Sequence, residues 1–133
     1  MSFRQKTAKY FSNHAETNEN HVDPSLQTHY YKTTRDKGLS MLENYFNNNG
    51  NYRINAISKD HGEISATIIK GKKAFIVATV IMVRPHQTAI DFSVTTESVF
   101  PFDLGYSTKI IQQLYQQVNK ELPIINNTNS QSR

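Results

Sequence analysis

The stretch KAFIVATVIMV, residues 73–83, decides the fold. It is the most apolar run in the chain, and its only charged residue is the first. An apolar run that is rich in β-branched residues and bounded by turn residues indicates a buried strand. We therefore expect this stretch to be the central strand of a small antiparallel sheet.

Turn residues divide the surrounding sequence into further strands. Gly, Pro, Asn and Asp clusters separate four segments that have strand-like composition. The four predicted strands span residues 52–58, 63–70, 73–83 and 87–96. A further short edge strand is predicted at residues 28–32.

Two amphipathic helices flank the strands. The first is predicted at residues 34–47, where Leu39, Leu42 and Phe46 fall on one face, and Thr33 with Asp36 loosely matches a capping box. The second is predicted at residues 104–121 with Asp103 near its start. Its apolar stripe contains Ile111, Leu114, Tyr115, Val118 and Leu122.

These elements predict an α+β fold with the order helix, four antiparallel strands, helix, and with both helices on one face of the sheet. A length of 133 residues suggests one domain. We divide the chain into an N-terminal arm (1–27), a single α+β domain (28–123) and a disordered tail (124–133). Phe3, Tyr10 and Phe11 would share one face if the arm formed a short helix.

The strand register assigns a face to each side chain, because side chains alternate along a strand. A two-residue loop at residues 71–72 pairs Ile68 with Phe75, and a four-residue loop at residues 84–87 pairs Val83 with Thr88. The predicted core face then consists of Ile64, Ile68, Phe75, Val77, Ile81, Ile90, Phe92 and Val94.

The opposite face keeps an aliphatic stripe, formed by Ile76, Val80 and Met82, with Asp91 opposite Val80. A solvated sheet face normally alternates to polar residues, and contiguous apolar patches tend to be sites. We therefore predict that these four residues form an interaction face. We expect this face to be covered in one of three ways: by the N-terminal arm, by a second copy of the chain, or by a ligand or another protein.

The net charge of +4 is compatible with nucleic acid or anionic lipid but specifies neither. Lys70, Lys72 and Lys73 form a hairpin tip that is a candidate anion contact. Sheets that bind single-stranded nucleic acid usually carry exposed aromatic side chains, and the predicted open face has none. The sequence therefore disfavours nucleic-acid binding by the sheet.

No reaction is specified by a motif. The chain has no cysteine, which excludes disulfides, thiol catalysis and zinc–thiolate sites. Its five histidines fit no zinc spacing, and Asp91, Ser65 and Ser93 have no evident catalytic partner. We expect no enzyme activity, no cofactor and no metal. No apolar run reaches the roughly 18 residues of a membrane helix, and we expect a cytoplasmic location.

Residues 62–98, GEISATIIKGKKAFIVATVIMVRPHQTAIDFSVTTES, and residues 100–115, FPFDLGYSTKIIQQLY, resemble a family of small uncharacterised bacterial proteins labelled "cytosolic protein". The likeness extends back through SNHAET and HVDPSL in the arm. More distantly, Asp-Leu-Gly before the last helix resembles a broad domain-of-unknown-function family, although Tyr106 or Ser107 stands where that family commonly has Asn. The resemblance implies a bacterial cytoplasmic protein with an α+β fold, and no activity.

The predicted function is a non-enzymatic cytoplasmic module that acts through the open sheet face, by self-association or by binding another protein. The alternative is small-molecule or lipid binding in an apolar pocket between sheet and helices. A large contiguous cavity would favour this alternative, and a tightly packed core would remove it.

Overall fold

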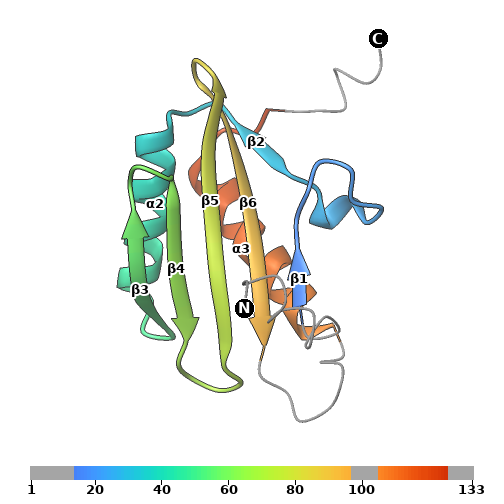
Figure 1. Ribbon diagram of the computed structural model, residues 1–133, viewed down its shortest axis with the longest axis vertical. Coiled ribbons are helices and arrows are strands. Elements are labelled where there is room, and N and C mark those ends of the chain that lie inside the picture. The colour runs from blue at the N-terminus through green and yellow to red at the C-terminus, as the bar shows by residue number, and fades with distance from the viewer. Residues whose placement is uncertain (1–13, 97–104, 126–133) are drawn as a thin grey trace, which may run out of the picture.

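The computed structural model describes residues 14–96 and 105–125 (Figure 1). The described chain begins with β1 (His14–Glu16), the short 3-10 helix η2 (Pro24–Leu26) and β2 (His29–Tyr31). The remaining elements are α2 (Arg35–Asn48), β3 (Tyr52–Ser58), β4 (Glu63–Ile68), β5 (Ala74–Arg84), β6 (Gln87–Thr96) and α3 (Tyr106–Glu121).

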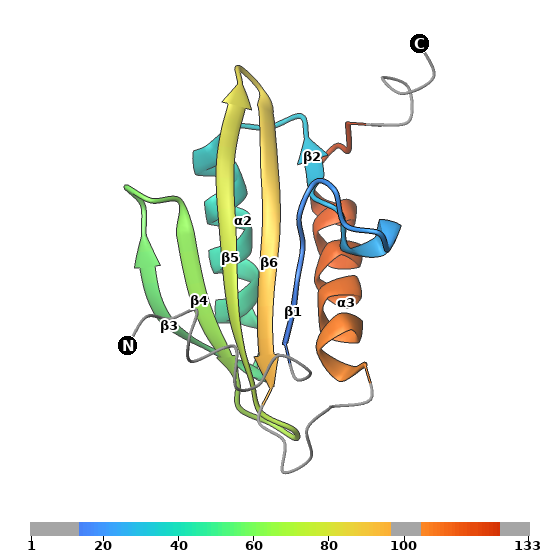
Figure 2. The same ribbon diagram turned by 45° about the vertical axis from the view of Figure 1, so that its right-hand side comes forward.

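The strands form one antiparallel sheet in the order β1-β6-β5-β4-β3, and β2 also pairs with β6. One edge of β6 is therefore shared by β1 and β2, while β5 occupies the other edge. Both α-helices lie on the same face of the sheet (Figures 1 and 2). The α+β class, the antiparallel sheet and the placement of the helices are confirmed.

The number and order of the elements differ from the prediction. The sheet has six strands rather than four with one short addition, and two strands precede the first α-helix. The segment from His14 to Gln27, which we assigned to an arm, contributes β1 and η2 to the domain. β1 is three residues long and polar, so neither periodicity nor composition marks it. Phe3, Tyr10, Phe11 and Asp103 lie outside the described residues.

Both helices begin slightly later than expected. The N-cap of α2 is Thr34 rather than Thr33, and its hydroxyl accepts a hydrogen bond from the Lys37 backbone N–H at 3.3 Å. α3 starts after Gly105, whose φ of 79° is a left-handed conformation that favours glycine. The buried faces match the predicted stripes: Leu39, Leu42 and Phe46 on α2, and Ile111, Leu114, Tyr115 and Val118 on α3.

The predicted core face is right on two strands and wrong on the central one. The residues assigned to the core on β4 and β6 are buried, namely Ile64, Ile68, Ile90, Phe92 and Val94. On β5, the buried residues are instead Ala74, Ile76, Ala78 and Val80. Phe75 and Ile81 are 37% and 50% exposed and point to the other face, as does the partly buried Val77.

The two hairpin connections explain this inversion. Pairing of β4 with β5 ends at Ile68 and Ala74, which leaves five residues in the connection instead of two. Between β5 and β6, Arg84 pairs with Gln87 across a two-residue turn, and the register shifts between Met82 and Arg84. Each assumed loop shifted the predicted pairing of β5 by one residue relative to the observed pairing. A shift of one residue moves every side chain of a strand to the opposite face of the sheet.

Two glycines fix the orientation of Val80. A Cβ on Gly38 of α2 would lie 3.1 Å from the Val80 Cγ1 atom. Gly62, at φ 69°, accepts a hydrogen bond from the Val80 N–H at 2.7 Å, and a Cβ there would lie 2.3 Å from the Val80 carbonyl oxygen. α2 and the β3–β4 turn therefore approach β5 closely from both sides of this residue.

Val80 and Ile81 should respond differently to truncation, because they are adjacent but face opposite ways. Val80→Ala removes part of a fully buried side chain and should lower the free energy of unfolding by about 1.5–3 kcal/mol. Ile81→Ala, at a half-exposed position, should cost less than about 1 kcal/mol. Urea denaturation measures both values. A larger loss for Ile81→Ala would contradict the register.

Candidate functional site

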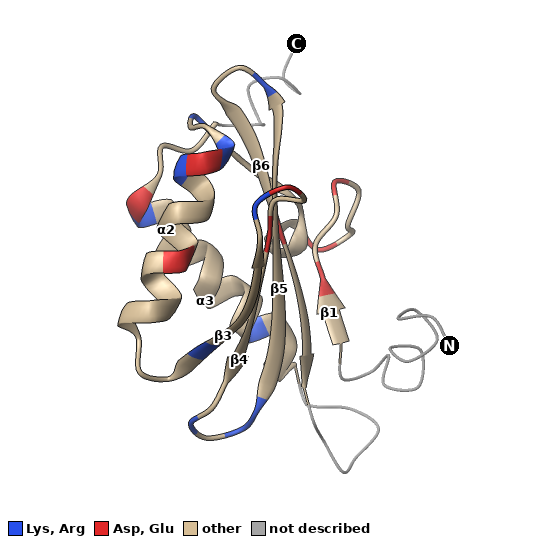
Figure 3. Cartoon of the chain, turned by 60° about the vertical axis from the view of Figure 1, so that its left-hand side comes forward, with Lys and Arg blue, Asp and Glu red and all other residues tan. Residues whose placement is uncertain are grey.

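The candidate functional surface is the sheet face that points away from α2 and α3, which we call the open face. In the described part of the chain neither helix covers it (Figures 1 and 3). On the four long strands the register assigns to it Arg53, Ala56, Ser58, Glu63, Ser65, Thr67, Phe75, Val77, Thr79, Ile81, Ala89, Asp91, Ser93 and Thr95.

Three of the four residues that we predicted for the interaction face are not on it. Ile76 and Val80 are fully buried beneath the helices, because β5 is turned over relative to the predicted register. Met82 pairs with the buried Thr88 and therefore also points to the helix side, where it is about half exposed and lines a surface hollow beside the start of α2. Asp91 lies on the open face as predicted.

An apolar stripe is nevertheless present on the central strand. Phe75, Val77 and Ile81 form it, with Thr79 between them, and hydroxyl-bearing residues flank it on β4 and β6. The expectation of an apolar stripe facing away from the helices therefore holds, but with different residues. The observed register also places an aromatic ring, that of Phe75, on a face where we expected none.

Phe75 is the centre of a row that crosses five strands. Cross-strand pairing aligns it with Thr67 and Arg53 on one side and with Thr95 and His14 on the other. Adjacent strands are about 4.8 Å apart, so the row spans roughly 19 Å. We call these five residues the Phe75 row.

Hydrogen bonds hold the polar members of the row beside the exposed ring. The Asn55 amide donates to the Thr67 hydroxyl at 2.8 Å. A hydrogen bond of 2.7 Å joins His14 Nδ1 to the Thr95 hydroxyl, and another of 2.9 Å joins His14 Nε2 to the Glu16 carboxylate. The row thus begins with a guanidinium on β3 and ends beside a carboxylate on β1.

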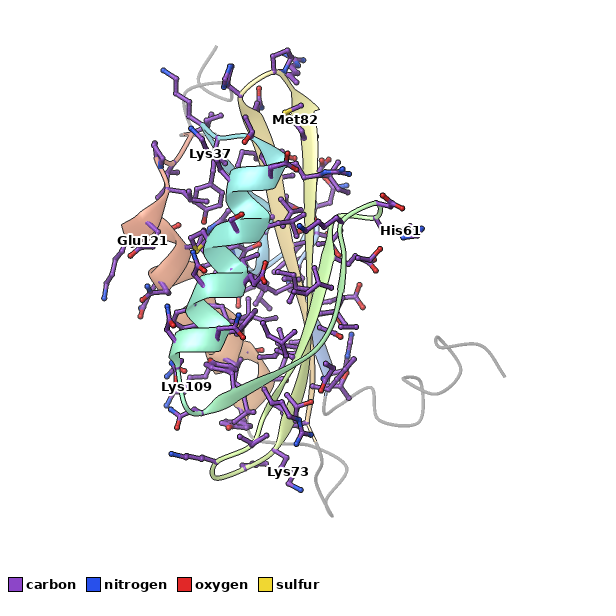
Figure 4. All side chains as sticks on the ribbon, turned by 90° about the vertical axis from the view of Figure 1, so that its left-hand side faces the viewer. Lys37, His61, Lys73, Met82, Lys109 and Glu121 are labelled. Atoms are coloured by element: carbon purple, nitrogen blue, oxygen red, sulfur yellow. The ribbon has the colours of Figure 1, made fainter. Side chains whose placement is uncertain are left out.

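Five exposed cations gather at the same end of the molecule, which we call the basic end. Its residues are Lys70, Lys72 and Lys73 of the β4–β5 connection, with Arg53 and Lys109. The Tyr106 hydroxyl donates to the Lys72 carbonyl at 2.9 Å, and the Lys72 ammonium lies 5.0 Å from the Tyr106 ring centroid. These contacts join the connection to the start of α3 and bring Lys109 to the same end as Lys73 (Figure 4).

Among the described residues, the segments next to these cations carry no carboxylate. β3, residues 69–73 and the first turn of α3 contain neither Asp nor Glu. Figure 3 shows the acidic residues elsewhere, on α2, on the β3–β4 turn and on the N-terminal segment. The described side chains at the basic end therefore contribute positive charge, to which the N-terminal end of the α3 dipole adds.

Asp91 has a structural role that the sequence did not reveal. One of its carboxylate oxygens accepts hydrogen bonds from the hydroxyls of Thr17 and Thr28, each at 2.6 Å. These two threonines are the ends of the segment that leaves β1 and returns as β2, and both are buried. Asp91 therefore joins the two ends of this loop by hydrogen bonds.

Removing the Asp91 carboxylate should release the two ends of the 17–28 loop from each other. Asp91→Ala leaves two buried hydroxyls without their acceptor, and we expect the free energy of unfolding to fall by about 2–3 kcal/mol. The 17–28 loop should also become more sensitive to protease. Asp60→Ala, at an exposed turn, is the matched control and should change neither property. An equal effect at both positions would contradict the assignment.

The histidines do not assemble a catalytic or metal site in the described region. His61 Nδ1 lies 2.8 Å from the Ser58 hydroxyl, a pair that sequence analysis missed, but the same hydroxyl accepts from the His61 backbone N–H. No described carboxylate bonds to this imidazole, so the pair lacks an orienting group and serves the turn. No cluster of three or more described His, Asp or Glu residues is arranged to hold a metal ion.

His29 is stacked on Tyr115 with the ring centroids 3.6 Å apart. Burial lowers the pKa of His29, and the charge of Asp91 and a hydrogen bond with Asn119 oppose this shift only in part. The neutral imidazole is therefore the form that the folded chain favours.

This lowered pKa predicts a pH dependence of stability. As the pH falls, His29 of the unfolded chain takes up a proton near pH 6.5, whereas His29 of the native chain does so only at lower pH. The contribution of the neutral imidazole to the free energy of unfolding is therefore fully present above pH 6.5. It should decrease as the pH falls from about 6.5 towards the native pKa. His29→Gln should flatten this decrease, whereas the exposed His86→Asn should not. Urea midpoints measured across the pH range test it, and identical profiles for all three chains would contradict it.

The space between sheet and helices is filled by side chains. Phe46, Phe92 and Leu114 are each about 1% exposed. A surface hollow of about 840 Å³ lies instead between α2 and α3 and has a largely polar lining that includes Asp36, Asn44, Gln117 and Glu121. This packing gives no support to a ligand pocket between sheet and helices.

A scan against protein-family models finds no match for this chain, and a search of curated proteins finds none either. The resemblance to small bacterial proteins therefore stays a prediction. Of the two α-helices in the described region, neither is long and apolar enough to cross a membrane.

Proposed function

We propose that the chain is a non-enzymatic binding module that works through its open face, and that its partner is a nucleic acid held at the basic end. The observation that carries the proposal is the convergence of five cations from β3, residues 69–73 and the first turn of α3, segments whose described residues contain no carboxylate. Lysine and arginine side chains that neutralise phosphates release counterions, and this release supplies most of the affinity of non-specific nucleic-acid binding.

The corrected register supports this partner. We expected no nucleic acid because the predicted open face had no aromatic residue. Phe75 lies on that face and is 37% exposed, so the reason for the exclusion no longer holds. The hydroxyls of Thr67 and Thr95 beside it are groups that bind sugar and phosphate oxygens.

Other partners would use the surface differently. An anionic membrane would gain from apolar side chains at the same tip as the cations. Ile69 and Phe75 are 39% and 37% exposed near the cations, but the larger exposed apolar group, Ile81, Met82 and Val83, lies at the other end of β5. A second copy of the chain or another protein, our expectation from the sequence, would engage that apolar end and would depend little on the lysines.

The test compares two triple variants with equal changes of charge. Replacing Lys70, Lys72 and Lys73 by Gln should weaken binding of a fluorescein-labelled oligonucleotide of about 12 nucleotides. It should also reduce the slope of log affinity against log salt by up to about 2, which is roughly 0.7 for each phosphate that the lysines no longer neutralise. The control replaces the exposed Lys32, Lys37 and Lys120 by Gln and should leave the slope unchanged. Fluorescence anisotropy between about 50 and 200 mM salt measures both.

Three results would show that the proposed function is wrong. The first is the absence of salt-dependent binding to any oligonucleotide. The second is an equal effect of the two triple variants. The third is binding only to vesicles of phosphatidylserine and phosphatidylcholine, or a dimeric molar mass without nucleic-acid binding.

A further inference from the structure

The geometry of the Phe75 row points to a more specific partner: we infer that the open face binds single-stranded nucleic acid by stacking a base on Phe75. This inference rests on the proposed function and deepens it. It depends on the alignment of a cation, two hydroxyls and an exposed aromatic ring across the sheet, and not on the lysines of the basic end alone.

Phe75 is placed as a stacking residue would be. It stands on the central strand β5, one position from the start of that strand, and its pair partners are the smaller Thr67 and Thr95. A phenyl ring with smaller neighbours on both sides leaves room for a base above it. Base–aromatic stacking is tolerant of sequence because every base has a π-face.

The hydroxyls beside the ring are held in position. Thr67 accepts from Asn55, and Thr95 is hydrogen-bonded to His14, so both oxygens sit at fixed places on either side of the ring. The charge along the row runs from Arg53 on β3 to Glu16 next to His14 on β1. The phosphates should therefore follow the β3 side of the ring, close to Lys73 and the rest of the basic end.

The dimensions of this surface favour a single strand over a duplex. The major groove of B-DNA is about 12 Å wide and admits a helix or a two-stranded ribbon. The Phe75 row is wider, at roughly 19 Å, and belongs to the broad face of a sheet. A duplex would meet this face with its phosphates only and would leave Phe75 without a base, because its bases are already stacked on one another.

The experiment uses the absence of tryptophan from the chain. Phe75→Trp keeps an aromatic ring at the site and introduces a single fluorophore. Unlabelled oligo(dT) and oligo(rU) of about 12 nucleotides should quench this fluorescence, since a stacked base lies against the indole. Ile81→Trp is the matched control, six residues and about 20 Å along the same strand, and its fluorescence should not change.

The affinity of the same single strands gives a second readout. Phe75→Leu keeps an apolar side chain but removes the ring, and it should weaken binding by about 5- to 100-fold, the alanine-substitution cost of one base stack. Its salt dependence should stay that of the unaltered chain, because every cation is retained. Phe75→Trp should bind at least as tightly as the unaltered chain. A duplex of the same length should bind more weakly, and its affinity, measured by anisotropy, should not change in Phe75→Leu.

The outcomes separate this inference from the proposed function. Oligonucleotide binding without quenching in Phe75→Trp, or with full affinity in Phe75→Leu, would overturn the stacking inference while the proposed function stands. Equal affinity for duplex and single strand would do the same. Absence of binding to every nucleic acid would overturn both. Quenching by either oligonucleotide supports the inference.

Discussion

The close packing of α2 and the β3–β4 turn around Val80 determines which side of β5 meets the helices. Gly38 and Gly62 permit this approach, because a Cβ on Gly62 would collide with the Val80 carbonyl oxygen and a Cβ on Gly38 would press against the Val80 side chain. With Val80 inside, its alternate neighbours Ala74, Ile76 and Ala78 are inside as well. Phe75 and Ile81 must then face outward, so the character of the open face follows from a contact on the opposite side of the sheet.

β6 is the strand on which the rest of the sheet is assembled. It pairs with β5 along one edge and receives both N-terminal strands along the other. Asp91 lies on this strand between the two, where its carboxylate holds Thr17 and Thr28. An edge that would otherwise be open to other chains is thus covered by the same chain.

Sequence reasoning reached the fold class, both helices, five of the six described strands (the short edge strand β2 among them) and the facing of β4 and β6. It failed on β5 because both sides of that strand are apolar, so alternation does not identify the inner one. The two assumed hairpin registers agreed with each other, yet both were displaced by one residue on the shared strand. Ile64 stands across β5 from Phe92 in either register, so that agreement could not expose the error. Gly38 and Gly62 were the available signal, since glycine inside a helix or beside a strand marks close approach.

The candidate site was likewise predictable from the sequence only in part. The lysines of the hairpin tip are evident from their spacing, whereas the Phe75 row depends on the register and on β1, a strand with no sequence signature. The partners of Asp91 lie 74 and 63 residues away in the chain, and no local pattern predicts such contacts.

The sharing of β6 by β1 and β2 has a consequence for how the chain is made. β3 to β6 form consecutive hairpins, whose contacts are local and close early. The strands that emerge first from the ribosome have no pairing partner until β6 has been synthesised. β1 and β2 are translated before the other strands of the sheet but are among the last to dock, because the strand edge that they bind has not yet been made.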